Sequence, residues 1–179
     1  MYHRVFAFDF DGTLAENGLV PATLQLALEQ LHAAGDALFL VTGRLFGSLE
    51  LGSLGDLFTG IVWENGAVLY HVATGETYLP FGHLGPHLVE ALEAAGVPIE
   101  RGRAIVATWK LHEQTVWQVL ENWGGDPIMV HNKEALMVLP PGASKGSGLE
   151  RLLGLCGFSP RNLVSFGDAE NDLPMLRLG

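Results

Sequence analysis

Short, fully apolar runs alternate with helix-like segments along the first third of the chain. Three such runs are residues 5–8, 37–41 and 60–63. Between the first two, Pro21 opens a helix that Gly35 closes, and residues 45–54 predict a second helix. Strands that are buried on both faces and separated by helices indicate βαβ units, so we expect a parallel sheet covered on both sides.

The pattern changes in the middle of the chain. Two short runs, residues 67–70 and 77–79, flank a Thr-Gly turn and predict a β-hairpin. The elements expected after it are helices at residues 84–95 and 112–123 and strands at residues 104–109, 128–130 and 135–139. Helices next to adjacent strands indicate a small α+β unit, which we place at residues 81–139 as an insertion.

The core pattern returns after the Pro-Pro-Gly sequence at residues 140–142. It consists of a helix at residues 147–155 and a last apolar strand at residues 163–166. The expected fold class is therefore α/β. A Rossmann-like parallel sheet is formed by residues 1–80 and 140–179, with the α+β insertion between them.

Composition narrows the class of protein. The 179 residues are 48% hydrophobic with a mean hydropathy of +0.25, which is typical of a folded domain with a sizeable core. The formal net charge of −10 argues against binding to nucleic acid or to an acidic membrane surface. No apolar run is long enough to span a bilayer. A single cysteine, Cys156, and an N-terminus without a signal-peptide pattern favour a cytoplasmic location.

Polar residues follow three of the predicted core strands. These residues are Asp9, Thr42 and Asp168, and the carboxyl ends of parallel strands meet at one crevice. Asp11 can point into the same crevice as Asp9, and Asp172 lies one turn beyond Asp168. Four carboxylates at one site repel one another unless a cation lies among them. Ligation by oxygen alone suits Mg²⁺.

Lys145 follows the Pro-Pro-Gly sequence and precedes a helix. Its ammonium group and the Thr42 hydroxyl suit phosphate oxygens, and phosphoryl transfer needs mainly positioning and charge neutralisation. One carboxylate as nucleophile and a second as proton donor fit covalent catalysis. Taken singly, each signal also fits an ordinary role: a solvated turn, a surface lysine, or a helix cap formed by the last two acids.

Four segments carry a resemblance to a known family. They are Asp9-Phe10-Asp11-Gly12-Thr13-Leu14, Val41-Thr42-Gly43-Arg44, Lys145 and Gly167-Asp168-Ala169-Glu170-Asn171-Asp172. In this order they resemble the four motifs of the haloacid dehalogenase-like superfamily. The insertion between the second and third motifs resembles the type-2 cap of the group that includes sugar-phosphate and phosphoglycolate phosphatases. The sequence Glu64-Asn65-Gly66-Ala67 before the hairpin is also similar to that group.

The resemblance implies a role for each motif residue. Asp9 is implied as the nucleophile and Asp11 as the general acid, which later acts as the base. The residues implied to bind the phosphoryl group or lie beside it are Thr42, Gly43, Lys145 and Asn171. Mg²⁺ would be held by Asp9, Asp168 and the backbone carbonyl of Asp11, with Asp172 steadying the metal shell. The substrate would be a small phosphorylated metabolite.

The insertion offers few readable signals for specificity. We expect contacts with the substrate or the cap from Arg44, and from Lys110 and His112 at the end of a cap strand. Trp117 and Trp123 fall at helix positions that are consistent with core packing. The short cap predicts compact substrates rather than polymers.

Two other functions use the same residues. A phosphomutase would form the same phospho-aspartate and hand the phosphoryl group back. A non-enzymatic phospho-acceptor or binding module would carry Asp9 without turnover. Asp11 argues against such a receiver, because a switch benefits from slow dephosphorylation, and a lid over the site also favours an enzyme.

The chain departs from the family after Asp172, where residues 173–178 form only the start of a helix. The superfamily normally continues with a further strand and helix. We therefore expect a fragment or the head of a longer protein. The strand that leads to Asp168 would then be a bare hydrophobic edge, which favours a homodimer or attachment to a further C-terminal segment.

Overall fold

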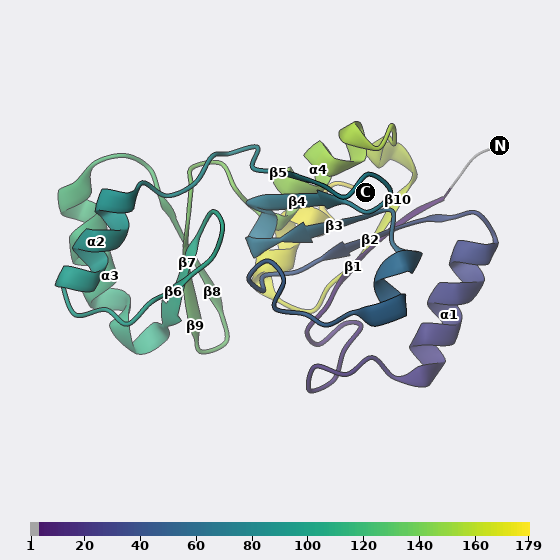
Figure 1. The fold of residues 1–179 in the computed structure, drawn as a ribbon, viewed down its shortest axis with the longest axis horizontal. Helices are drawn as coiled ribbons and strands as arrows, with labels where there is room; N and C mark the ends of the chain where they lie inside the picture. The colour runs from purple at the N-terminus through teal and green to yellow at the C-terminus, as the bar shows by residue number, and fades with distance from the viewer. Residues whose placement is uncertain (1–3) are drawn as a thin grey trace.

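The computed structural model describes residues 4–179, and the first three residues of the N-terminus considered above lie outside it. The chain forms two sheets (Figure 1). The strands of the larger sheet are β1 (Val5–Asp9), β2 (Ala37–Val41), β3 (Gly60–Trp63), β4 (Val68–His71), β5 (Glu76–Tyr78) and β10 (Leu163–Phe166). Their order is β10-β1-β2-β3-β4-β5, parallel from β10 to β3 and antiparallel from β3 to β5. The predicted α/β fold class is confirmed.

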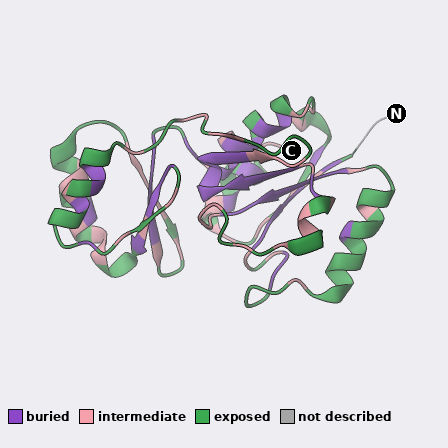
Figure 2. Ribbon diagram, viewed as in Figure 1, coloured by how far each residue is buried: buried purple, intermediate pink, exposed green. Residues whose placement is uncertain are grey.

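Helices cover both faces of this sheet. The covering elements are α1 (Ala22–Ala33), the 3-10 helix η1 (Gly52–Leu57), α4 (Lys145–Leu155) and α5 (Leu173–Leu176). One layer of the core packs under α1 and η1, and the other packs under α4 and α5. β2 is buried along its length because Leu38 and Leu40 enter the first layer while Phe39 and Val41 enter the second (Figure 2).

The smaller sheet and its helices form a second unit, which we call the cap. Its elements are α2 (Pro86–Ala94), β6 (Glu100–Arg101), β7 (Val106–Trp109), the 3-10 turn η3 (Lys110–His112), α3 (Glu113–Trp123), β8 (Ile128–Asn132) and β9 (Ala135–Leu139). The strand order is β6-β7-β9-β8, and every pair is antiparallel. Figure 1 shows the cap sheet between its own helices and the core. One face of the sheet therefore packs on α2 and α3, and the other faces the core.

Two local predictions are wrong. Residues 45–54 do not form an α-helix: they form turns that lead into η1. Gly47 and Gly52 lie in this segment with φ of 79° and 52°, a left-handed conformation that ends a helix. Trp117 and Trp123 are not core residues, since they are 52% and 43% exposed; α3 turns Val116 toward the cap sheet instead.

β10 forms one edge of the larger sheet, as predicted for the strand that leads to Asp168. Val164 and Phe166 are exposed on it, at 46% and 42%, and Phe166 stacks on Phe8 of β1 with ring centroids 5.1 Å apart. Within residues 4–179, no helix combines the length and apolar character that a membrane crossing needs.

Candidate active site

Neighbouring strands bring the three predicted strand-end residues to the same edge of the sheet. β1 lies between β10 and β2, with Phe8 opposite Phe166 and Asp9 opposite Val41. Asp9 therefore lies at the carboxyl end of the middle strand of these three, with Thr42 directly after β2 and Asp168 just beyond β10. This register makes residues that are far apart in sequence into neighbours.

A buried lysine joins two of the acids. The Lys145 Nζ atom donates to Asp9 Oδ1 at 2.5 Å and to Asp172 Oδ1 at 2.6 Å. All three side chains are buried, with relative exposures of 2%, 5% and 0% for Lys145, Asp9 and Asp172. Lys145 is the first residue of α4, whose N-terminus is capped by Ser144 in a reciprocal pair with Ser147. The Ser144 N-cap thus fixes where α4 begins, and with it the backbone position from which the Lys145 side chain reaches the two acids.

Burial acts against the charge of Asp9. Removal from water raises the pKa of Asp9 to about 6, while the neighbouring Lys145 ammonium acts in the opposite direction. The Asp9 carboxylate is therefore still mostly ionised near neutral pH, although burial makes its charge less stable than that of an exposed aspartate.

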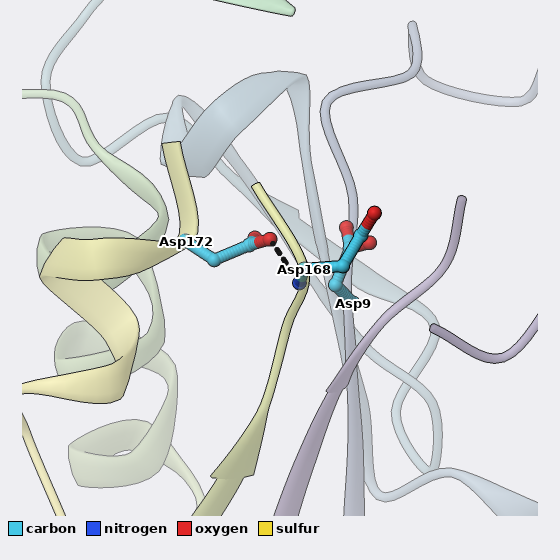
Figure 3. A group of neighbouring side chains, drawn as sticks. All are labelled: Asp9, Asp168 and Asp172. Atoms are coloured by element: carbon cyan, nitrogen blue, oxygen red, sulfur yellow. Dashed lines mark hydrogen bonds between the residues drawn. The ribbon is translucent and has the colours of Figure 1, made fainter. Parts of the chain in front are cut away.

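Asp9, Asp168 and Asp172 form a compact acidic group (Figure 3). One carboxylate oxygen of each lies within 4.8 Å of the others. Asp172 uses Oδ2 to accept the backbone N–H groups of Asp168 and Ala169, at 3.1 and 2.9 Å. Because both oxygens of Asp172 already have partners, Asp9 and Asp168 are better placed to face an ion directly, and Asp172 to steady them.

The acidic group fits a divalent cation. Three carboxylates and one ammonium leave a formal charge of −2, and every donor atom is an oxygen, as Mg²⁺ prefers. The chain also makes room for Asp168: a Cβ on Gly12 would lie 2.4 Å from Asp168 Oδ2, and Gly12 has a φ of 96°. Only glycine fits there without strain.

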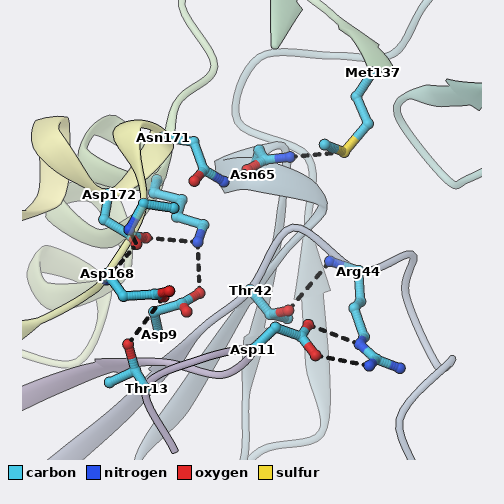
Figure 4. Close-up of polar contacts among 12 residues, drawn as sticks. Asp9, Asp11, Thr13, Thr42, Arg44, Asn65, Met137, Asp168, Asn171 and Asp172 are labelled. Atoms are coloured by element: carbon cyan, nitrogen blue, oxygen red, sulfur yellow. Dashed lines mark hydrogen bonds and ion pairs between the residues drawn. The ribbon is translucent and has the colours of Figure 1, made fainter. Parts of the chain in front are cut away.

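Asp11 has a different partner from Asp9. Its carboxylate accepts from Arg44 Nε at 2.8 Å and from Arg44 Nη2 at 2.7 Å, a bidentate pair (Figure 4). Asp11 in turn raises the pKa of the Arg44 guanidinium. Thr42 is 1% exposed and accepts the backbone N–H of Arg44 at 3.2 Å. The Asp11 side chain is thus held outside the group formed by Asp9, Asp168 and Asp172.

Asn171 lies beside the site on the short 3-10 turn η5 (Glu170–Asp172). Its Nδ2 donates to Asn65 Oδ1 at 2.9 Å, and its own Oδ1 is buried without a partner among the described residues. A Cβ on Gly43 would meet the Asn65 amide at 3.0 Å. Gly43 therefore lets the second motif approach the Asn65 side chain closely.

The two cap residues predicted for specificity do not line the cavity nearest to Asp11. Lys110 and His112 belong to η3, after β7, and neither lines the cavity of about 390 Å³ beside Asp11 and Arg44. The cap residue that does line this cavity is Lys133, in the turn between β8 and β9. A lysine in a short polar turn carries no sequence signal, so only the fold identifies it.

Comparison with known proteins identifies the family. A model of the haloacid dehalogenase-like hydrolase family matches residues 6–80 and 107–178. A phosphoglycolate phosphatase of Halorubrum lacusprofundi is 31% identical over 180 residues, covering 93% of this chain and 77% of that protein. One from Methanothermobacter thermautotrophicus is 27% identical over 194 residues, covering 97% and 80%.

A solved structure shares the fold at low identity. It is a sugar phosphatase of subclass IIB of the same superfamily, 21% identical, with a TM-score of 0.77 and coverage of 97% of this chain and 84% of that one. The family match spans both parts of the core, with all four motifs inside it. The chain belongs to the haloacid dehalogenase-like hydrolase family.

Proposed function

We propose that the protein is a Mg²⁺-dependent phosphatase in which Asp9 attacks a small phosphate monoester and is transiently phosphorylated. The observation that carries this proposal is the buried Lys145 ammonium shared by Asp9 and Asp172 next to Asp168. A nucleophile, a fixed positive charge and an acidic group for a cation lie within one crevice. That set serves phosphoryl transfer, which depends on positioning and charge neutralisation.

The residues divide the chemistry in two steps. In the first, an Asp9 oxygen forms a bond to phosphorus, the bond to the leaving oxygen breaks, and Asp11 donates a proton to that oxygen. In the second, Asp11 takes a proton from a water molecule, which attacks phosphorus and releases Asp9 and inorganic phosphate. Asp9 and Asp168 would hold Mg²⁺, which when bound neutralises charge on the phosphoryl oxygens.

The remaining residues position the phosphoryl group. Lys145, at the start of α4, and the Thr42 hydroxyl, directly after β2, lie beside Asp9 and would bind the phosphoryl oxygens. Asn171, whose Nδ2 donates to Asn65 Oδ1 and whose Oδ1 is buried without a partner among the described residues, would lie beside the phosphoryl group. Arg44 orients Asp11 toward the leaving group.

The cavity favours a compact and acidic substrate. At about 390 Å³ it admits a small metabolite, and Lys133 faces it from the cap while Arg44 lies on the core side. A leaving group with its own negative charge, such as the carboxylate of phosphoglycolate, would meet the Lys133 ammonium there, although Glu16 and the Asp11–Arg44 ion pair also line the cavity. The phosphoglycolate phosphatases among the relatives support the same substrate class. The cytoplasmic location predicted from the single cysteine is part of this proposal.

A phosphate-release assay tests the proposal. The chain is incubated with phosphoglycolate, a panel of sugar phosphates and p-nitrophenyl phosphate, with Mg²⁺ and with EDTA. We expect the wild type to release phosphate with Mg²⁺ and not with EDTA. Asp9→Asn should lose this activity, and the exposed control Asp56→Asn should keep the full rate. Release that survives Asp9→Asn would exclude the covalent route. Transfer of phosphate to a second sugar without release would identify a phosphomutase.

A further inference from the structure

Glu64 is a buried carboxylate that the proposed reaction does not use. It follows β3 directly, on the 3-10 turn η2 (Glu64–Gly66), and is 0% exposed. Its carboxylate accepts four backbone N–H groups. The donors are Phe46 at 3.1 Å and Arg103 at 2.9 Å to Oε1, and Ala104 at 2.9 Å and Ile105 at 3.2 Å to Oε2. Three of the four donors belong to the cap.

The surrounding backbone is shaped around this carboxylate. Glu64 and Asn65 both have positive φ, 54° and 52°, a conformation that non-glycine residues adopt rarely and at a cost. On the cap side, a Cβ on Gly102 would lie 2.6 Å from Glu64 Oε2. The turn between β6 and β7 can therefore close over the carboxylate only because residue 102 has no side chain.

No cation compensates Glu64 among the described contacts. The nearest guanidinium on the same turn, that of Arg103, lies instead over the Phe46 ring at 3.8 Å from its centroid. The charge is stabilised by the amides alone, in charge-assisted hydrogen bonds that are stronger than neutral ones. Separating the cap from the core would break three of these bonds at once.

The same residue also holds the loop after β2. The Glu64 N–H donates to the Arg44 carbonyl at 3.0 Å, and the Phe46 N–H donates to the Glu64 carboxylate. Arg44 in turn holds Asp11. Glu64 thus touches the cap through residues 103–105 and the Asp11 partner through residues 44–46.

We propose that Glu64 is a latch: a positioning residue that seats the cap on the core and, through the same carboxylate, fixes the loop that carries Arg44. Two chain segments connect cap and core, one between β5 and α2 and one between β9 and α4. Glu64 adds hydrogen bonds that can open, next to the Asn65–Met137 contact and the apolar packing of Ile105 and Leu139 against the core. The latch rests on the proposed function only for its effect on turnover, because seating itself is measured without substrate.

Two variants remove the latch from opposite sides. Glu64→Gln removes the charge and turns an amide group toward amide donors. Gly102→Ala leaves the carboxylate intact and places a methyl group 2.6 Å from Oε2, too close for both to stay in place. The matched controls are Gly85→Ala, at the N-terminus of α2, where an added Cβ meets nothing within 4 Å, and Glu121→Gln, an exposed carboxylate on α3.

Hydrogen–deuterium exchange of the full chain without substrate is the first measurement. We expect the amides of residues 103–105 and of Phe46 to exchange at least about tenfold faster in both latch variants, because each loses a hydrogen bond to a charged acceptor. Both controls keep the wild-type rates. In the double variant the exchange rates match those of the single variants and the two effects do not add, since both changes break the same interaction. Wild-type protection at residues 103–105 in both variants, or additive effects, would overturn the latch.

Turnover is the second measurement and separates a latch from a purely stabilising residue. We expect kcat/KM for phosphoglycolate to fall about tenfold in both latch variants at a temperature where circular dichroism shows them fully folded. The Mg²⁺-dependent rate with p-nitrophenyl phosphate, whose leaving group needs little help from Asp11 or the cap, changes less than threefold. Equal losses on both substrates contradict the latch. If the wild type releases no phosphate at all, the proposed function fails, and the exchange experiment still decides the latch.

Discussion

Asp9 and Asp11 are two residues apart and occupy different electrostatic environments. Asp9 is buried against the Lys145 ammonium, and its pKa is raised to about 6. Asp11 is 31% exposed and accepts hydrogen bonds from Nε and Nη2 of Arg44. Pairs of acids in such contrasting surroundings can take different roles in catalysis.

The raised pKa of Asp9 predicts a pH dependence of stability. Between its ordinary pKa of 3.8 and about 6, the folded metal-free protein keeps a proton that the unfolded chain has lost. The contribution of Asp9 therefore favours folding below pH 4 and is lost as the pH rises through 6. Asn cannot ionise. The unfolding free energy of Asp9→Asn, relative to that of the wild type, should therefore rise by about 2–3 kcal/mol as the pH increases from 4 to 7.

Urea unfolding in EDTA at a series of pH values measures this difference. Comparing Asp9→Asn with the wild type at each pH cancels the titration of the other carboxylates. A difference in unfolding free energy that stays constant from pH 4 to pH 7 would contradict a raised Asp9 pKa.

Lys133 and Lys110 make a discriminating pair for substrate recognition. Lys133→Ala removes the cap cation that lines the cavity beside Arg44, so KM for phosphoglycolate should rise about tenfold with kcat nearly unchanged. Lys110→Ala removes a charge of the same kind from η3 and should leave KM unchanged. Steady-state kinetics on the two variants decides which lysine contacts the substrate. A raised KM in Lys110→Ala and an unchanged KM in Lys133→Ala would favour Lys110, the residue expected from the sequence.

At the scale of elements, the position of Lys145 depends on close contact between α4 and η2. A Cβ on Gly148 would lie 2.4 Å from the Gly66 Cα atom, and one on Gly66 would lie 1.8 Å from the Ser144 carbonyl oxygen. Two glycines thus let the first turn of α4 touch the turn that follows β3. This contact places Lys145 beside Asp9 and Glu64 beside the cap, so one packing interaction serves both.

Two glycines on α4 test this contact. Gly148→Ala should lower the unfolding free energy by about 1–3 kcal/mol, because the added methyl forces helix and turn apart. Gly154→Ala, on the same helix with nothing within 4 Å of the added Cβ, should raise it by about 0.5–1 kcal/mol through helix propensity. Chemical denaturation measures both. Similar effects of the two substitutions would show that the contact is loose.

At the scale of the whole molecule, three carboxylates gather at one point in a chain whose formal net charge is already −10. The carboxylates of Asp9, Asp168 and Asp172 come from two ends of the sequence and gather only when the sheet forms. A cation that binds this arrangement binds the folded state far better than the unfolded chain. Metal binding and folding are therefore linked.

Mg²⁺ should raise the melting temperature. At about 100 times its dissociation constant it stabilises the fold by about 2.7 kcal/mol, which corresponds to roughly 5–10 °C for a chain of this size. Thermal melts with MgCl₂, against KCl of equal ionic strength, measure the shift. Asp168→Asn should lose most of it, and Asp56→Asn should keep it. A wild-type melting temperature that does not respond to Mg²⁺ would contradict the metal site.

The sequence predicted most of the core because its signals are local. The apolar run of β2 and the Ser-capped start of α4 lie in a few consecutive residues, although α4 begins at Lys145, two residues earlier than expected. The helix expected at residues 45–54 failed because Gly47 and Gly52 adopt left-handed conformations, and the two-residue strand β6 has no apolar pattern to reveal it.

The sequence by itself determined the family and the α/β class, through the acids and the threonine that follow strand ends and the lysine that precedes a helix. Only the tertiary structure decided which groups meet. It paired Asp11 with Arg44, Asn171 with Asn65, and Glu64 with the amides of residues 103–105. Strand-end residues are predictable because parallel strands share one edge by rule. Partners contributed by the cap depend on how two sheets pack, and no local pattern encodes that.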